Sequence, residues 1–177
     1  MVRLVVEGAI YHVYGRGNNK FKIFHVGYDY AKYKRNLVKY KSQYLFKLYS
    51  YAMLPNHLHL LIEPKLPGDL SKIMQSLNLS YAKWHNKRYD CVGHVWQGRY
   101  GDRVIKNDQN LISCMAYIEN NPVKAGLVED PGAYKWSSCH ERFHNMKDSL
   151  IDFHPTYLAL GESDQERKRI YYSYISS

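Results

Sequence analysis

Several short stretches of the chain are rich in apolar residues in patterns that predict β-strands. Ala9–Gly15 alternates polar and apolar positions, and Leu45–Met53 combines aromatic with aliphatic residues. After the turn at Pro55-Asn56, His57–Glu63 reads as a further strand. Arg103–Lys106 is apolar enough for a short fourth strand. The pattern therefore predicts four strands separated by longer segments.

Helical spacing of apolar residues marks the segments between these strands. We expect helices over Tyr28–Gln43, from Asp69 as the capping residue, over Gln109–Asn120 with Asp108 as the cap, and over Asp164–Ile175. The helix that starts at Asp69 has a predicted buried stripe of Leu70, Ile73, Met74, Leu77, Tyr81 and Trp84.

The order of these elements predicts the fold class. A strand, a helix, two strands, a helix, a strand and a helix form the split βαβ pattern of a ferredoxin-like α+β domain. We expect an antiparallel sheet with helices on one face and the other face available for binding. Residues 1–177 are expected to form a single domain, with a core at about 9–128 and an additional C-terminal extension at about 129–177.

Length and composition narrow the class of protein. The 177 residues are 45% hydrophobic, which suits one packed domain, and no apolar run approaches the roughly 18–20 residues of a membrane span. Met1–Ile10 lacks the long apolar region of a signal peptide, so a cytoplasmic protein with no membrane partner is expected. The three cysteines, Cys91, Cys114 and Cys139, contain no Cys-x-x-Cys pair, which argues against a thiolate zinc site.

Charge adds a candidate partner. The net charge is +9, and residues 1–50 hold ten Lys and Arg against two acids. A basic first half favours a polyanionic partner, although charge alone does not separate a nucleic acid from a soluble basic protein with none. The 18 tyrosines are able to stack on bases, but their abundance means that a special role for any one needs a positional argument.

One strand carries a pair of potential metal ligands. Alternation along a strand places His57 and His59 on one face and Leu58 and Leu60 on the other. Two imidazoles on one face are able to share a divalent cation. The pattern alone fits equally an ordinary pair of surface or edge histidines.

Tyr117 stands out among the tyrosines by its position on the predicted helix. Tyr117 and Asn121 are four residues apart and share a helix face, roughly 110–150° from the centre of the apolar stripe. That stripe consists of Leu111, Ile112, Met115 and Ile118. Tyr117 is therefore not simply a core residue. Because Pro122 disfavours helical geometry at the residue before it, Asn121 is expected at the frayed helix end.

Four segments in this order resemble the HUH (His-hydrophobe-His) single-tyrosine transposases, and in particular the REP-associated tyrosine transposase type of the insertion-sequence transposase superfamily. The segments are Tyr14–Asn18 with Ile23-Phe24, Met53–Leu61, Gly93–Tyr100 and Tyr117–Val128; Tyr134–Ser138 also fits. The resemblance covers roughly residues 9–140, and it implies the same ferredoxin-like fold.

The resemblance also implies a reaction. Tyr117 would be the nucleophile that cleaves single-stranded DNA and forms a 5′-phosphotyrosine, from which the strand is transferred. His57 and His59 would hold Mg²⁺ or Mn²⁺ with Asn121 as a third ligand, a place often filled by glutamine in the wider family. The partner would be single-stranded or hairpin DNA. Relatives often form homodimers, and some place the tyrosine helix against the partner's histidines, so whether the site forms within one chain stays open.

Further residues are candidates for contact with DNA. They are Arg16, Lys20, Trp96, Gln97, Arg99, Tyr100 and Arg103, which offer cations for phosphates and aromatic rings for unpaired bases. Two other functions remain open. One is a non-catalytic nucleic-acid-binding module of the same fold. The other is a metal-dependent hydrolase, which needs carboxylates near the histidines, and Glu63 is the one carboxylate on that strand face.

Overall fold

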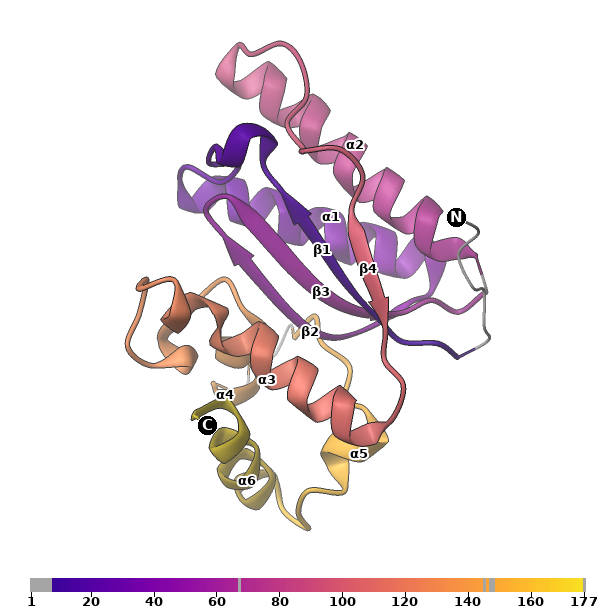
Figure 1. The fold of residues 1–177 in the computed structure, drawn as a ribbon, viewed down its shortest axis with the longest axis vertical. Coiled ribbons are helices and arrows are strands. Elements are labelled where there is room, and N and C mark those ends of the chain that lie inside the picture. Colours follow the sequence, from indigo (N-terminus) through magenta and orange to yellow (C-terminus); the bar gives the residue numbers. More distant parts are fainter. Residues whose placement is uncertain (1–7, 67, 145, 147–148, 177) are drawn as a thin grey trace.

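The computed structural model describes residues 8–66, 68–144, 146 and 149–176, so most of Met1–Ile10 lies outside the described residues. The strands are β1 (Tyr11–Arg16), β2 (Lys47–Leu54), β3 (His57–Glu63) and β4 (Gly101–Val104). The α-helices are α1 (Gly27–Tyr44), α2 (Asp69–Tyr89), α3 (Asp108–Lys124), α4 (Ser138–Phe143), α5 (Pro155–Leu158) and α6 (Asp164–Ser176). All elements predicted from the sequence are present, with ends shifted by a few residues (Figure 1).

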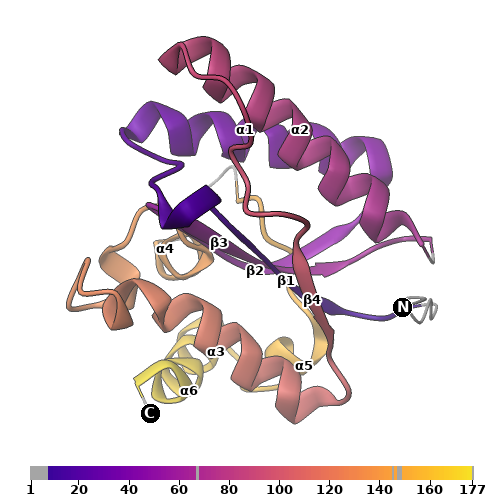
Figure 2. The same ribbon diagram turned by 45° about the horizontal axis from the view of Figure 1, so that its top comes forward.

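The four strands form one antiparallel sheet in the order β2-β3-β1-β4. This order, with α1 after β1 and α2 after β3, is the ferredoxin-like arrangement, which confirms the predicted fold class. The expected placement of helices needs one correction. Helices α1 and α2 cover one face of the sheet, but the other face is partly covered by α3 and the C-terminal helices (Figures 1 and 2).

Each face of the sheet has its own core because strand side chains alternate. Leu58, Leu60 and Ile62 of β3 pack in the core under α1 and α2. Leu61 packs in a second core with α3 residues such as Leu111 and with the C-terminal helices. His57 and His59 belong to this second face, so the predicted separation from Leu58 and Leu60 is confirmed.

Two helix starts differ from the prediction by one residue. Gly68, not Asp69, occupies the N-cap of α2, with a φ of +87° that suits glycine. Asn107, not Asp108, caps α3, and its side chain accepts a hydrogen bond of 2.8 Å from the backbone N–H of Asn110. In the predicted stripe of α2, Trp84 is only partly buried, and His85 is buried in addition.

The helix α3 also continues past the proline that was expected to limit it. Pro122 lies inside the helix and is buried, and it has no N–H to bond the carbonyl of Ile118 one turn earlier. The Asn121 side-chain nitrogen donates to the carbonyls of Tyr117 (2.7 Å) and Ile118 (3.5 Å). This amide thus compensates for the missing backbone donor, and Asn121 is helical rather than frayed.

Polar contacts fasten the C-terminal extension to α3 and to β2. Arg142 and Glu119 form an ion pair of 3.2 Å with both side chains fully buried. Arg142 also donates to the backbone carbonyl of Tyr49 (2.9 Å), and Ser138 Oγ donates to Glu119 (2.5 Å). The extension is therefore part of the packed domain, and it is held by hydrogen bonds as much as by apolar contact.

Two expectations about membranes and cysteines can be compared with the described residues. None of the helices formed by these residues is both long and apolar enough to cross a membrane. The cysteines are free thiols: Cys139 is buried, Cys114 is half-buried and Cys91 is exposed.

Candidate active site

The two histidines of the His-x-His motif lie in the middle of the sheet, on the face of α3. β3 is paired with β2 on one side and β1 on the other, and His59 lies between Ala52 and Tyr14. The ring centres of His57 and His59 are 5.2 Å apart and the ring planes are nearly perpendicular, at 89°. The strand therefore presents two imidazoles side by side, as alternation predicts.

Helix α3 brings Tyr117 to the same place. The Tyr117 ring centre lies 5.9 Å from that of His59, in an edge-on arrangement, and both residues belong to one chain. Together with His12, Tyr14 and Arg103 they line a cavity of about 620 Å³. Tyr117 is 44% exposed, so its side chain is open to solvent and to a ligand in this cavity. Tyr117 and His59 are thus assembled without a second copy.

His12 was missed by the sequence analysis, although it belongs to the same cluster. It lies on β1, and its Nε2 is 2.9 Å from Nδ1 of His59. Its ring centre is also 5.9 Å from that of Tyr117. The alternation Tyr11-His12-Val13-Tyr14 was a usable signal, because it places His12 and Tyr14 on one face of β1.

Asn56, the residue before the motif, binds the other histidine. Its Oδ1 is 2.7 Å from Nδ1 of His57, and its Nδ2 donates to the backbone carbonyl of Lys20 (3.3 Å). Asn56 thus connects His57 to the loop that follows β1. This loop approaches the turn again where the Gly17 N–H donates to the Asn56 carbonyl (2.8 Å).

Burial keeps these imidazoles neutral. It lowers the pKa of His59 from 6.5 to about 3, with the neighbouring His12 and His57 adding to the effect. Burial also lowers the pKa of His12 to about 4, helped by the positive charge of Arg103. The pKa of His57 is lowered by burial and then by Arg16. The neutral form is the one able to ligate a cation, because its second nitrogen keeps a lone pair.

The donor set at this site is small. Among the described residues there is no group of three or more His, Cys, Asp or Glu side chains that could hold a metal ion. The two imidazoles of His57 and His59 fit a divalent cation whose remaining ligands are waters and oxygens of a bound phosphate. Mg²⁺ and Mn²⁺, the cations expected from the sequence, take such oxygen ligands.

Asn121 and Glu63 are the two other residues that the sequence connects with this site. The Asn121 side-chain nitrogen donates within its own helix, which leaves Oδ1, the amide atom that ligates cations, without a role in that bond. Of the residues expected to hold the metal ion, His59 lines the cavity with Tyr117, whereas neither His57 nor Asn121 is among its described lining residues. Glu63, at the far end of β3, is hydrogen-bonded to Tyr49 and lies 3.8 Å from Lys47. These contacts of Glu63 remove the support for a hydrolase with a carboxylate at the histidines.

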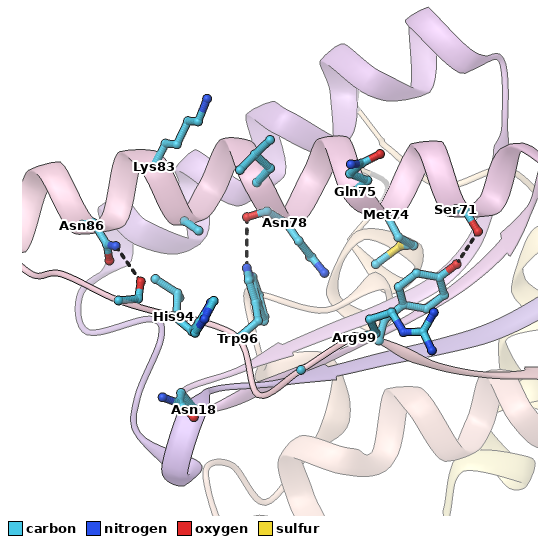
Figure 3. Close-up of a pocket in the computed structure, with 16 residues that line it drawn as sticks. Asn18, Ser71, Met74, Gln75, Asn78, Lys83, Asn86, His94, Trp96 and Arg99 are labelled. Atoms are coloured by element: carbon cyan, nitrogen blue, oxygen red, sulfur yellow. Dashed lines mark hydrogen bonds between the residues drawn. The ribbon is translucent and has the colours of Figure 1, made fainter.

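A second cavity, of about 820 Å³, lies between α2 and the segment 93–100 (Figure 3). Three of the predicted DNA-contacting residues, Trp96, Arg99 and Tyr100, are in its lining. The Trp96 indole N–H donates to the backbone carbonyl of Asn78 (3.0 Å), and its ring packs near Tyr33. Trp96 is therefore half-buried and supports the cavity wall, while Arg99 is exposed.

The remaining predicted DNA contacts lie along β1 and at β4. Arg16 faces solvent at the end of β1, opposite His57 in the strand pairing, and Lys20 is exposed in the following loop. Gln97 is held beside Arg16 by a backbone hydrogen bond of 2.8 Å. Arg103 pairs with His12 and lines the Tyr117 cavity. The structure thus divides the predicted set between the two cavities and the end of β1 with the loop that follows it.

Comparisons with known proteins agree with this arrangement. Residues 5–121 match the family model described as "Transposase IS200 like". A REP-associated tyrosine transposase of Haemophilus influenzae is 27% identical over 124 residues, covering 63% of this chain and 70% of the relative. One from Escherichia coli is 24% identical over 114 residues, covering 63% of this chain and 66% of the relative.

A solved structure shares the fold. It is a REP-associated tyrosine transposase bound to a REP hairpin, with a TM-score of 0.67, 20% identity, and coverage of 86% of this chain and 93% of the other. The family match spans well over half of this chain and includes the His57–His59 strand and Tyr117. The chain therefore belongs to the IS200-like transposase family of DNA transposases.

Proposed function

We propose that this chain cleaves single-stranded DNA with Tyr117 and transfers the strand through a 5′-phosphotyrosine, beside a metal ion held by His57 and His59. The observation that carries the proposal is the approach of Tyr117 to His59 within one chain, at 5.9 Å between ring centres, in an open cavity. The cavity also contains His12, His59 and Arg103, whose side chains are able to bind a phosphate. Family membership supplies the reaction class.

The reaction exchanges one phosphodiester for another. Tyr117 Oη forms a bond to phosphorus, the bond from phosphorus to the 3′-oxygen breaks, and the phenol proton ends on the released 3′-hydroxyl. Attack by a second 3′-hydroxyl reverses these changes on a new strand, so no water or oxidant is consumed. Lys124, whose Nζ is 5.1 Å from the Tyr117 ring centre, places a positive charge beside the ring as the proton leaves.

His57 and His59 would hold Mg²⁺ or Mn²⁺, which when bound supplies Lewis-acid polarisation of the scissile phosphate. Neutral imidazoles add no negative charge to such a site. Arg103, exposed at the rim of the cavity, is suited to bind a phosphate of the same strand and to orient it toward Tyr117. The arrangement supports a site assembled in cis.

We infer that the substrate is single-stranded DNA adjoining a hairpin. The relative with the same fold is bound to a REP hairpin. In this chain, the Gln97 N–H donates to the carbonyl of Arg16 at the end of β1, and Arg99 lines the cavity beside α2 (Figure 3). A hairpin stem would bind at the cavity beside α2, and an unpaired strand would run along β1 toward the Tyr117 cavity.

The test is covalent trapping. The protein is incubated with Mn²⁺ and a labelled oligonucleotide that carries a hairpin with single-stranded flanks, and the adduct is resolved on a denaturing gel. The wild type is expected to form an adduct that Tyr117→Phe does not form. The matched control is Tyr14→Phe, because the Tyr14 ring lies 6.3 Å from that of His59 in the same cavity.

Retention of the adduct by Tyr117→Phe together with its loss in Tyr14→Phe would move the nucleophile to Tyr14. If the wild type binds the oligonucleotide but forms no adduct with Mg²⁺ or Mn²⁺, the non-catalytic DNA-binding module is favoured instead. That alternative predicts equal DNA affinity for the wild type and both variants.

A further inference from the structure

Both histidines of the proposed metal site have their Nδ1 atoms engaged by a neighbour. His57 Nδ1 lies 2.7 Å from Asn56 Oδ1, and His59 Nδ1 lies 2.9 Å from His12 Nε2. A neutral imidazole carries one proton, so the partner of one nitrogen decides whether the other has a lone pair. These two contacts therefore determine which atoms His57 and His59 offer to a cation.

The contact with Asn56 allows only one tautomer of His57. Asn56 Nδ2 donates to the Lys20 carbonyl, which only accepts, and this fixes which end of the Asn56 amide faces His57. The Asn56 oxygen is an acceptor, so His57 Nδ1 must carry the proton and donate. His57 therefore presents Nε2 with a free lone pair.

The contact with His12 allows two tautomers of His59, because either ring is able to be the donor. If His59 Nδ1 donates to His12, then His59 Nε2 has a lone pair. If His12 Nε2 donates instead, the proton of His59 is on Nε2 and neither nitrogen of His59 is available to a cation. Only the first arrangement matches His57, with a lone pair on Nε2 of both rings.

We propose that His12 is a positioning residue, which accepts the Nδ1 proton of His59 and so presents His59 Nε2 to the metal ion. His12 suits this role because it is fixed on β1, is only 9% exposed, and pairs across the sheet with Leu61 on β3. Partners of this kind orient metal-ligating histidines and set their tautomer. His12 would thus accept the Nδ1 proton of His59, as Asn56 accepts the Nδ1 proton of His57. The inference rests on the proposed metal site.

The first experiment reads the tautomers directly. Histidine ¹⁵N–¹H correlation spectra of the metal-free protein at neutral pH report which ring nitrogen is protonated in each histidine. We expect the Nδ1–H form for both His57 and His59. In His12→Phe, His59 should shift toward the Nε2–H form while His57 is unchanged, and Asn56→Ala should give the reverse pattern.

The second experiment measures Mn²⁺ affinity from the EPR signal of the free ion, in a Tyr117→Phe background so that no chemistry occurs. We expect His12→Phe to weaken Mn²⁺ binding by about 10–100-fold, the usual effect of removing such a partner. His12→Gln should restore the affinity to within a few-fold, because its Oε1 is able to accept the same proton. Circular dichroism confirms that each variant is folded.

Three results would overturn the proposal: an Nε2–H tautomer for His59 in the wild type, unchanged Mn²⁺ affinity in His12→Phe, or no recovery in His12→Gln. If the Tyr117→Phe protein with an intact His12 binds no Mn²⁺, the proposed metal site itself is wrong. If only the proposed role of His12 is wrong, the protein still binds Mn²⁺, and this result distinguishes an incorrect role of His12 from an incorrect metal site.

Discussion

The buried ion pair between α3 and α4 allows a quantitative test of how the Tyr117 helix is held. Arg142→Met removes the guanidinium and leaves the Glu119 carboxylate, two residues from Tyr117, at 0% exposure without its cationic partner. Loss of one member of a buried pair typically costs about 3–5 kcal/mol. The variant also loses the contact of the guanidinium with the Tyr157 ring, 4.4 Å from its centre. We therefore expect the free energy of unfolding to fall by about 3–5 kcal/mol or more.

Urea denaturation followed by circular dichroism measures this difference. The second substitution of the test, Glu119→Gln in the Arg142→Met protein, should recover part of the loss, because a buried amide needs no counter-charge. The comparison is Lys72→Met, which removes an exposed lysine 2.9 Å from Asp69 and should cost about 1 kcal/mol or less. A loss below about 1 kcal/mol in Arg142→Met, or no recovery with Glu119→Gln, would refute the assigned role of this pair.

Three further predictions address the site and its surroundings. Asn121→Ala should lower stability by about 0.5–1.5 kcal/mol in urea denaturation, and Pro122→Ala should rescue it by restoring a backbone donor; if Asn121 acts only as a metal ligand, no rescue will occur. If the site forms in cis, a mixture of Tyr117→Phe and His59→Ala should form no more DNA adduct than either alone, whereas exchange of α3 between chains would restore the adduct. Burial lowers the pKa of His85 from 6.5, so the unfolded chain binds a proton that the folded chain does not, and stability should fall as the pH drops below about 6.5. Urea titrations at several pH values should show a smaller fall in His85→Phe; an equal fall would exclude His85 as a source.

Local patterns were enough to predict the elements that build the sheet. Alternation separated His57 and His59 from Leu58 and Leu60, and each expected strand and helix formed. Tyr117 was placed off the apolar stripe of α3 by the same reasoning. These predictions held because they depend on residues that are neighbours in sequence.

The features that were missed depend on contacts between distant segments. His12 joins His59 only through the pairing of β1 with β3, a register that a single strand pattern does not reveal. The helix extends past Pro122 because of a side-chain hydrogen bond from Asn121. The C-terminal extension lacks a clear period because residues such as Arg142 are buried through polar contacts, here with Glu119 of α3, which hydrophobic patterns do not detect.

The way α3 is fastened also limits how this chain is able to exchange parts with another copy. Glu119 ties the tyrosine helix to Arg142 of α4, and Arg142 is bonded in turn to the backbone of β2. Moving α3 into a second molecule would break this ion pair within the chain, and Glu119 would have to form it again with Arg142 of the other copy. In the proposed function, this ion pair favours a Tyr117 that acts with the histidines of its own chain.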